Sequence, residues 1–391
     1  MRILHTNFLH GWGGQSNRIL SVCRGLAERG HDVLIAAPGD SELIRRARSA
    51  NLSADGSMTF RRGFRPLALA RDIRRMRRLL GRRTGGMPVG AQAPCRGGFD
   101  LVHTHGSQDS WVVALANLPK RLPVVRTKHN IFPIRDHFAN RWLYGRAFDR
   151  VICISGAIVE QCAAKPYVQR DRLALVHSAV DLERFAQPDR ARVEAWRSQW
   201  AGPQPVVAVV GRLRREKGHR FLLEAIAQLR RDFPAILLVV AGDGSLRAEL
   251  EQNAAALGIR DHVRFLGFRT DVPEILAAAD LFVLPSLAEG LGTAAIEAAA
   301  AGRPVVASRV GGLTDIIRDG ETGRLVEPGD AAALTRAIAQ LLADWQLAKR
   351  LAQAARRYAS EHFTVAALVE KTEAVYAQML ENPGNSHSGS P

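Results

Sequence analysis

The chain has 391 residues, of which 47% are hydrophobic and 24% are charged. A chain of this length is too long for one ordinary core and predicts two domains. Its apolar runs all fall short of the roughly 18–20 residues that a membrane-spanning helix needs. The start, Met1–Asn7, predicts a strand and not a signal peptide. We therefore expect a soluble, cytoplasmic protein.

The net charge of +16 is concentrated in one segment. Between Arg61 and Arg83 there are ten arginines and a single acid, Asp72. Such a local excess of positive charge favours an anionic partner. Nucleic acid is a weak candidate, because only 6% of the chain is aromatic and no nucleic-acid-binding motif is present.

The same segment carries an apolar stripe at helical spacing, formed by Leu69, Ile73, Met76 and Leu80. Two interpretations remain open. The helix either packs on the core with a solvated basic face, or lies at an anionic membrane surface or against a phosphorylated, lipid-linked acceptor.

Short apolar runs alternate with helical patterns along the whole chain. The predicted strands are Arg2–His5, Asp32–Ala37, Asp100–Thr104, Pro123–Thr127 and Arg150–Ile154, then Val206–Val210, Ile236–Ala241, Val263–Phe265, Leu281–Leu284 and Pro304–Ala307. The predicted helices include Gln15–Arg29, Arg220–Asp232 and Leu246–Leu257. Strands that read as continuous apolar runs are typical of parallel sheets covered on both faces. The fold class predicted is α/β, with two Rossmann-like, doubly wound parallel-sheet domains facing each other across a cleft.

One polar stretch with Trp and Pro interrupts the alternation of strands and helices, and it predicts the boundary between the two domains. In order, we expect an N-terminal Rossmann-like domain at 1–180, a linker at 181–204, a C-terminal Rossmann-like domain at 205–360, a C-terminal helix at 361–381 that packs back towards the first domain, and a disordered tail at 382–391. The Gly- and Pro-rich residues 84–98 predict a flexible loop. The four cysteines have no metal-ligand spacing and predict reduced thiols.

Two glutamates eight positions apart, Glu289 and Glu297, lie between two predicted strands. We expect Thr293 to cap a helix that runs to about Ala301, with Gly292 leaving the first amides open. A helix N-terminus with free N–H groups binds anions, and phosphate is the expected one. The glutamates would then bind hydroxyl groups on either side of that phosphate.

A basic loop, Gly211–Gly218, directly follows the strand that reads PVVAVV. Arg212 and Lys217 in this loop place two cations where a diphosphate could bind. Near the N-terminus, Gly11–Gly14 also lies between a strand and a helix, but the dinucleotide pattern G-x-G-x-x-G is not completed. A Walker A motif and an Asp-x-Asp pair are both absent from the sequence, so no metal is expected.

These motifs resemble glycosyltransferase family 4, the retaining enzymes of the GT-B fold. The resemblance covers nearly the whole chain, from G-G-x-S-x-R at Gly13–Arg18 and G-L-A-E-R-G-H-D-V at Gly25–Val33 to D-G-E-T-G-R-L-V-E-P-G-D at Asp319–Asp330. One departure is S-A-V-D at Ser178–Asp181, where the family usually reads N-G-V-D.

The resemblance implies that the domain at 1–180 binds the acceptor and that the domain at 205–360 binds the donor. It also implies roles for individual residues. Arg212 and Lys217 would neutralise the leaving diphosphate, Glu297 would hold the ribose hydroxyls, and Glu289 would contact the donor sugar. Amides at Thr293 and Ala294, after Gly292, would bind phosphate, and Gly13 and Gly14 would let the N-terminal loop approach it. His105 would lie near the donor sugar, with His103 as the alternative. Thr127–Asn130 resembles another cleft motif of the family, less specifically.

The expected function is transfer of a sugar from a nucleoside diphosphate sugar to a glycan or lipid-linked acceptor, in lipopolysaccharide or other cell-envelope polysaccharide synthesis. No cofactor or metal is expected. The Arg61–Arg83 segment would hold the enzyme peripherally at the inner face of the cytoplasmic membrane. Two alternatives remain: a sugar-nucleotide epimerase of the same fold, and a non-enzymatic polyanion-binding protein.

Overall fold

A computed structural model gives the structure of residues 1–61, 63, 65–81, 98–118, 122–200 and 204–381. The chain divides into two compact units. The N-terminal unit consists of Met1–Ser178 together with Val365–Pro391, and the C-terminal unit is Ala179–Thr364. Cys95, the predicted tail at 382–391 and all but Gly98 of the predicted 84–98 loop lie outside the described residues.

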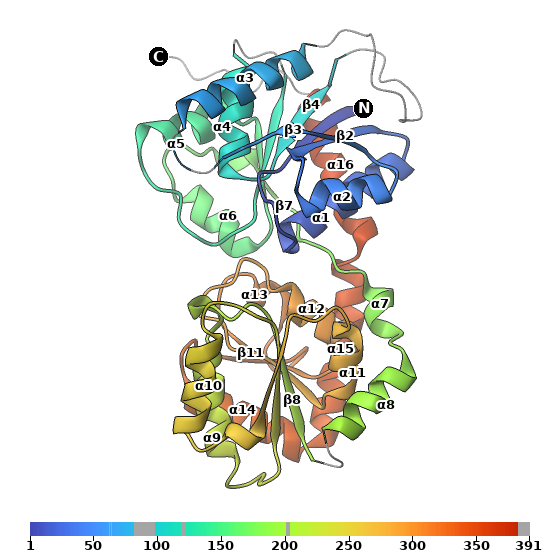
Figure 1. Ribbon diagram of the computed structural model, residues 1–391, viewed down its shortest axis with the longest axis vertical. Coiled ribbons are helices and arrows are strands. Elements are labelled where there is room, and N and C mark those ends of the chain that lie inside the picture. Colours follow the sequence, from blue (N-terminus) through green and yellow to red (C-terminus); the bar gives the residue numbers. More distant parts are fainter. Residues whose placement is uncertain (62, 64, 82–97, 119–121, 201–203, 382–391) are drawn as a thin grey trace. The chain divides into compact units, whose positions relative to one another are not determined.

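The N-terminal unit is built on a seven-stranded parallel sheet in the order β3-β2-β1-β4-β5-β6-β7 (Figure 1). Its strands are β1 (Arg2–Thr6), β2 (Asp32–Pro38), β3 (Ser53–Met58), β4 (Leu101–Thr104), β5 (Val124–Lys128), β6 (Arg150–Cys153) and β7 (Leu173–Leu175). Its α-helices are α1 (Gly14–Glu28), α2 (Glu42–Ser49), α3 (Pro66–Leu80), α4 (Ser107–Ala116), α5 (Phe138–Trp142), α6 (Gly156–Ala163) and α16 (Val365–Glu381). Because all neighbouring strands are parallel, the carboxyl ends of the strands meet at one edge of the sheet.

The C-terminal unit holds a six-stranded parallel sheet in the order β10-β9-β8-β11-β12-β13. Its strands are β8 (Val206–Val210), β9 (Leu237–Ala241), β10 (Val263–Gly267), β11 (Leu281–Leu284), β12 (Val305–Ser308) and β13 (Arg324–Val326). Its α-helices are α7 (Leu182–Ala186), α8 (Arg190–Gln199), α9 (His219–Leu229), α10 (Arg247–Ala256), α11 (Val272–Ala278), α12 (Thr293–Ala300), α13 (Leu313–Ile316), α14 (Ala331–Ala343) and α15 (Trp345–His362). The predicted fold class, two α/β domains with parallel sheets, is confirmed.

Three strands were not predicted from the sequence: β3, β7 and β13. All three lie at an edge of their sheet. An edge strand is paired on one side only, and it can be short or polar without leaving a core unfilled. The strand β3 reads SADGSM and only its last residue is buried, so it has none of the apolar signal of the central strands.

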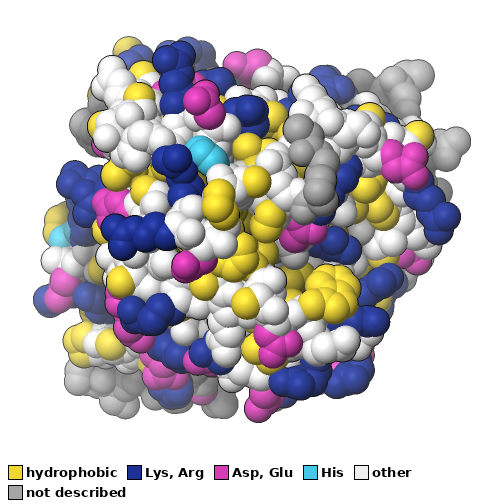
Figure 2. Space-filling view, turned by 90° about the horizontal axis from the view of Figure 1, so that it is seen from below, with side chains coloured by type: hydrophobic (Ala, Val, Ile, Leu, Met, Phe, Trp, Pro, Cys, Tyr) yellow, Lys and Arg dark blue, Asp and Glu magenta, His cyan; other side chains and the backbone are white. Residues whose placement is uncertain are grey.

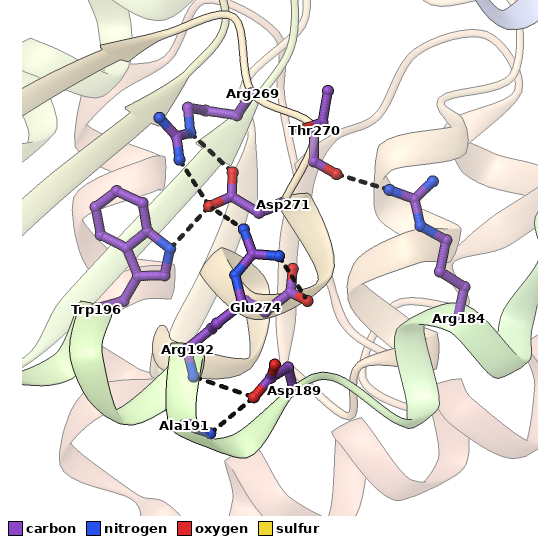
Figure 3. Close-up of polar contacts among 9 residues, drawn as sticks. All are labelled: Arg184, Asp189, Ala191, Arg192, Trp196, Arg269, Thr270, Asp271 and Glu274. Atoms are coloured by element: carbon purple, nitrogen blue, oxygen red, sulfur yellow. Dashed lines mark hydrogen bonds and ion pairs between the residues drawn. The ribbon is translucent and has the colours of Figure 1, made fainter.

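The segment 181–204, assigned to a linker from the sequence, contains α7 and α8, and both helices belong to the C-terminal unit. Figure 3 shows how α8 is fastened to the N-terminus of α11. The buried carboxylate of Asp271 pairs with Arg269 at 2.7 Å and Arg192 at 3.1 Å, and accepts a hydrogen bond from Trp196 at 3.2 Å. The hydrogen bonds from Arg269 lower the pKa of Asp271 to about 2. On α7, Arg184 donates to the carbonyl of Thr270.

The last helix of the chain, α16, is part of the N-terminal unit and packs against α1. The two helices approach closely at Gly25, where an added Cβ would lie 2.4 Å from a methyl group of Val369. The sequence predicts one helix over 361–381, whereas the structure ends α15 at His362 and starts α16 at Val365.

The arginine-rich segment forms α3, and its apolar stripe is turned towards the protein. Met76 is buried, and Leu69, Ile73 and Leu80 are half-buried. The helix packs against α4 and β3. No described helix is long and apolar enough to cross a membrane.

Candidate functional site

The loop after β8 is held against the end of β11 by a close backbone approach. Gly218 adopts φ +66°, and a Cβ there would lie 1.9 Å from the carbonyl oxygen of Pro285. Any other residue would be strained and would clash with that carbonyl. This packing lets Lys217 reach Glu289, and the Nζ–Oε2 distance is 2.6 Å.

Glu289 therefore lies beside the basic loop and not out in solvent. Its carboxylate also accepts a hydrogen bond from Ser286 at 3.2 Å. Lys217 and Glu289 are both largely shielded, with 18% and 12% of their side chains exposed. The partial burial makes this pair stronger than an open surface ion pair.

The helix α12 begins one residue earlier than predicted. Gly292, with φ +93°, is its N-cap, and Thr293 is its first helical residue. The prediction that Thr293 caps the helix is thus wrong. A left-handed N-cap suits glycine, and a Cβ at this position would lie 2.4 Å from Leu313. Because no side chain caps the helix, the first amides, at Thr293 and Ala294, are left without an intrahelical partner. The helix N-terminus is thus open, as predicted, and its binding of an anion stays a prediction.

Two of the predicted site residues in this region have no ion-pair partner among the described residues. Arg212 is exposed on the loop after β8. Glu297, one turn into α12, is half-buried, and burial raises the pKa of its carboxyl group to about 7, with Arg184 acting weakly in the opposite direction. A half-buried carboxylate without a partner is costly in the absence of ligand. These groups are the ones that a bound ligand would satisfy.

In the N-terminal unit, the glycine loop leads into α1. Gly13 is the N-cap and Gly14 the first helical residue, and no side chain caps the helix. A Cβ at either glycine would meet no atom within 4 Å. The space on the Cβ side of these two glycines is therefore open.

A buried cluster of histidines lies at the carboxyl ends of three adjacent strands of the same unit. His5 is on β1, His103 and His105 are at the end of β4, and His129 directly follows β5. The Nδ1 atom of His5 lies 3.0 Å from Nε2 of His105, and Nδ1 of His105 lies 3.0 Å from Nε2 of His129. Asp109, in the first turn of α4, accepts a hydrogen bond from the backbone amide of His105 at 2.9 Å.

This geometry limits what His105 can do. Both of its ring nitrogens are occupied by other histidines, and its side chain is only 2% exposed. His103 is equally engaged, with its Nδ1 2.5 Å from the hydroxyl of Tyr376 and its Nε2 2.7 Å from Thr127. His129 is half-buried, and its Nδ1 has no partner among the described residues. Its part in the cluster was missed, although the Thr127–Asn130 motif pointed to that strand end.

The histidines are held neutral. Burial and the nearby charge of Arg18 lower the pKa of His5 to about 3, and the pKa values of His103, His105 and His129 are also lowered well below their usual range, chiefly by burial. Neutral imidazoles are metal ligands, and one nitrogen each of His5, His103 and His105 lie within 4.8 Å of one another. Both ring nitrogens of each of these three histidines already have hydrogen-bond partners, and the guanidinium of Arg18 disfavours an added cation.

A pocket of about 730 Å³ lies over the ends of β1, β2 and β3. These strands precede β4 and β5 in the strand order of the sheet, and β1 also carries His5 of the cluster. Leu9, Met58 and Phe60 contribute apolar surface, and Arg61 and Arg65 contribute positive charge. Both arginines are exposed and pair with no acidic side chain among the described residues.

The rim of that pocket is hydrogen-bonded to a buried carboxylate. Phe60 adopts φ +39°, which is uncommon for a residue with a side chain. The buried carboxylate of Asp72 on α3 holds it there, because it accepts hydrogen bonds from the amide of Phe60 at 2.8 Å and from the hydroxyl of Thr59 at 2.7 Å. The single acid of the arginine-rich segment is therefore a structural residue.

The predicted site residues thus fall into two sets, one in each unit. The C-terminal unit carries, on the loop after β8 and on the loop and helix α12 after β11, the residues Arg212, Lys217, Glu289, Gly292, Thr293, Ala294 and Glu297. The N-terminal unit carries Gly13, Gly14 and His105. Within the C-terminal unit, the structure pairs Lys217 with Glu289 directly.

Comparison with known proteins decides the family. The chain matches the model described as glycosyl transferases group 1 over residues 192–358 and that of glycosyltransferase family 4 over residues 12–184. It is 32% identical to a D-inositol 3-phosphate glycosyltransferase of Salinispora arenicola, over 94% of this chain and 89% of that one. The chain belongs to the group 1 glycosyltransferases of family 4. It is a glycosyltransferase enzyme.

Further relatives of this glycosyltransferase agree with that assignment. It is 28% identical to the lipopolysaccharide core biosynthesis glycosyltransferase LpsE of Rhizobium meliloti, over 97% of this chain and 99% of that one. Among solved structures, Anabaena Alr3699/HepE in complex with UDP-glucose covers 98% of this chain and 100% of its own, with a TM-score of 0.79 and 23% identity. A glycosyltransferase of Rickettsia africae has a TM-score of 0.83, with 20% identity and coverage of 97% and 99%. These structures show that the fold is GT-B.

Proposed function

We propose that this glycosyltransferase retains anomeric configuration and transfers a sugar from a nucleoside diphosphate sugar to a glycan or lipid-linked acceptor of the cell envelope. The donor assignment rests on the polar groups of the C-terminal unit that have no partner in the protein. Arg212, Glu297 and the first amides of α12 have no partners among the described residues, while Lys217 and Glu289 are already in contact. Such a set supplies cations and N–H donors for a diphosphate and a carboxylate for hydroxyl groups.

The chemistry follows from these residues. When the bond to the anomeric carbon breaks, negative charge grows on the leaving diphosphate. Arg212, Lys217 and the N-terminus of α12 would stabilise that charge without moving, which is the kind of electrostatic effect that accelerates group transfer most. Glu289 holds Lys217 at 2.6 Å and would bind a sugar hydroxyl with its second oxygen.

A nucleoside diphosphate sugar is also supported by comparison. Alr3699/HepE was solved with UDP and with UDP-glucose. We propose that the donor of this chain is of the same chemical class. Competition between nucleoside diphosphates in a calorimetric titration would identify the base, and NMR of the product would report its anomeric configuration. An inverted product would contradict the proposal of retention.

We propose that the reaction needs no metal ion. Two cations, Arg212 and Lys217, are available for the diphosphate, and the sequence has no Asp-x-Asp pair. Transfer should therefore continue in EDTA. A strict requirement for added magnesium or manganese would contradict this part of the proposal.

The acceptor is proposed to bind to the N-terminal unit. The pocket over β1, β2 and β3 combines apolar surface with Arg61 and Arg65, which suits a glycan that carries phosphate or carboxylate groups. The relative LpsE acts in lipopolysaccharide core biosynthesis. We therefore propose a lipopolysaccharide core or a similar lipid-anchored glycan as acceptor.

We further propose that the enzyme binds peripherally to the inner face of the cytoplasmic membrane through α3. Arg71, Arg74 and Arg78 are exposed and recur at helical spacing along one face of this helix, and Leu67 on the same face is 88% exposed. On the face of the molecule that Figure 2 displays, by contrast, basic and acidic side chains alternate, and its described residues form no purely basic patch. Near an anionic leaflet each basic residue contributes about 1 kcal/mol. Because the apolar stripe of α3 packs on the protein, the helix would bind the membrane surface electrostatically and would not insert into the bilayer.

Liposome co-sedimentation tests the membrane proposal. The protein should pellet with phosphatidylglycerol vesicles in low salt, but not with neutral vesicles or in high salt. Replacing Arg71, Arg74 and Arg78 by glutamine should release it while leaving donor hydrolysis unchanged. Arg24, Arg45 and Arg170, exposed in the same unit but each paired with a glutamate, provide the matched control substitutions. A triple variant of α3 that still pellets would contradict this role.

A further inference from the structure

One continuous hydrogen-bonded chain runs through the buried cluster of the N-terminal unit. It connects, in order, Thr127, His103, Tyr376, His5, His105 and His129. The successive distances are 2.7, 2.5, 3.3, 3.0 and 3.0 Å. Tyr376 lies on α16 and is fully buried. In the amino-acid sequence it follows all the other residues of this hydrogen-bonded chain by more than 240 positions. Its hydroxyl is the link between His103 and His5.

The number of protons restricts this chain to two states. Each neutral imidazole carries one N–H, and each hydroxyl carries one O–H. With one proton per group, every link is satisfied only if all the groups donate in the same direction. The tautomers of the four histidines are therefore set together and not one by one.

The link between Tyr376 and His103 selects the direction. At 2.5 Å it is the shortest of the five, and the phenol is a stronger donor than an imidazole N–H. We therefore assign the phenolic proton to the bond to Nδ1 of His103. His5 then donates from Nε2 to the oxygen of Tyr376, His105 donates from Nε2 to His5, and His129 donates from Nε2 to His105. This leaves Nδ1 of His129 without a proton and without a partner among the described residues.

We propose that Tyr376 is a positioning residue for sugar transfer: by ordering this chain it keeps His129 in the Nε2–H tautomer, with Nδ1 ready to accept a hydrogen bond from a substrate hydroxyl. The proposal rests on the proposed function of the enzyme. It gives the C-terminal helix a role in the site, since α16 is held on α1 and delivers the hydroxyl on which the proton order depends.

The surroundings favour such a chain. His5, His103, His105 and Tyr376 are each at most 2% exposed, so water does not compete for their protons. Arg18, which lies buried and donates to Ser178 at 3.2 Å, places a positive charge nearby. This charge and the burial keep the imidazoles neutral, which is the state that the proton order requires.

The direct test is NMR of the imidazole nitrogens, which distinguishes the two tautomers of a neutral histidine. In the wild type, His129 should be the Nε2–H tautomer. In Tyr376→Phe, His129 should become a mixture of tautomers, because the link between His103 and His5 is lost. Tyr167→Phe is the matched control: it removes a buried hydroxyl of the same unit that has no hydrogen-bond partner among the described residues. An Nδ1–H tautomer of His129 in the wild type, or an unchanged single tautomer in Tyr376→Phe, would overturn the proposal.

Kinetics provide the second readout. Tyr376→Phe should lower kcat about 10-fold or more, because an imidazole in the wrong tautomer presents the wrong group to the substrate. The KM for the donor should stay within about two-fold, since the donor-binding residues proposed above in the C-terminal unit are unchanged. Tyr167→Phe should leave kcat unchanged. Equal kcat values in both variants would overturn the role of Tyr376.

The order of protons in the cluster can be tested apart from sugar transfer and apart from metal binding. The tautomer measurement needs no substrate, so a wild type that transfers no sugar would overturn the proposed function while the proton order is still determined. Tight binding of Zn²⁺ alone, with displacement of the imidazole protons of His5, His103 and His105, would show a metal centre and overturn the proton-ordered chain.

Discussion

The loops of the C-terminal unit and the histidine cluster of the N-terminal unit both lie at the carboxyl ends of parallel strands. They differ in whether their polar groups have hydrogen-bond or ion-pair partners within the protein. After β8 and β11, Arg212, Glu297 and the first amides of α12 have no partners among the described residues. In the histidine cluster, both ring nitrogens of His5, His103 and His105 are hydrogen-bonded within the unit.

This difference indicates that one site binds a ligand directly and that the other positions a side chain. Groups without partners in the protein are available to a ligand, and the half-buried carboxylate of Glu297 gains most because its burial is uncompensated in the free protein. A fully bonded buried cluster has nothing left to offer a ligand directly, but it fixes the orientation and the proton of the group at its edge. The C-terminal loops are therefore proposed to bind the donor, and the cluster to position His129.

The largest expected effect is on the loop after β8. Lys217→Ala and Arg212→Ala should each reduce transfer about 10²–10³-fold, because each removes a preorganised charge contact to the leaving diphosphate. Neither residue belongs to the core, so the melting temperature should change little. Steady-state assays with a sugar nucleotide provide the measurement. Near-normal turnover in either variant would contradict the diphosphate site.

The next effect separates the two glutamates. Glu297→Ala should weaken binding of the bare nucleoside diphosphate about 10-fold or more, since hydrogen bonds to a charged group contribute about 1.5–3 kcal/mol. Glu289→Ala is its control and should spare this binding while it damages transfer, because Glu289 is proposed to contact the sugar. Calorimetry with the diphosphate alone compares them. Equal losses of affinity would refute the division of roles.

The buried histidines predict sensitivity to acid. In the folded state the pKa of His5 is about 3, whereas an unfolded histidine takes up a proton near pH 6.5. The unfolded state therefore binds more protons below pH 6.5, and the free energy of unfolding should fall as the pH drops from 6.5 towards 3, by about 1.4 kcal/mol per unit for this residue. Urea titrations between pH 7 and 5 would measure the slope.

A pair of variants isolates this contribution. His5→Gln should reduce the slope by close to one proton, because the substituted residue no longer titrates. His10→Gln makes the same substitution at an exposed histidine of the same unit and is the control for the change of side chain itself. A wild-type stability that is flat over this range would show that the histidines of the cluster are accessible to protons.

The smallest effect concerns a buried histidine in the C-terminal unit. His219 starts α9 directly after Gly218, and neither ring nitrogen has a partner among the described residues. An unpaired buried polar group costs about 1–3 kcal/mol. His219→Leu should therefore stabilise the fold by about 1 kcal/mol, as judged by chemical denaturation. A lower stability of the variant would show that the ring makes a stabilising polar contact in the folded protein.

The sequence signals for the proposed C-terminal site are local. Arg212 and Lys217 are within one loop, and Glu289 and Glu297 are within one turn and helix, so a linear motif could name these residues before the structure placed Lys217 against Glu289. The error there was one of detail: Gly292, and not Thr293, is the N-cap of α12. A glycine cap has no side-chain signature comparable to that of serine or threonine.

The histidine cluster could not be predicted in the same way. Its members come from β1, from the ends of β4 and β5 and from α16, and only the order of strands in the sheet brings them together. Sequence favoured His105 as the residue at the donor sugar, and nothing in a linear pattern shows that both its nitrogens are already bonded. Tyr376 lies in an ordinary amphipathic helix, where an aromatic residue is expected to pack.

Thermal denaturation with a series of nucleotides tests most directly the central claim that the C-terminal loops bind a nucleoside diphosphate. At a concentration 100 times its dissociation constant, one nucleoside diphosphate should raise the free energy of unfolding by about 2.7 kcal/mol, and the matching nucleoside without phosphate should have little effect. The stabilisation should be lost in Glu297→Ala and reduced in Arg212→Ala. If no nucleoside diphosphate stabilises the protein at millimolar concentration, or if the bare nucleoside stabilises it equally, the donor site proposed here is contradicted.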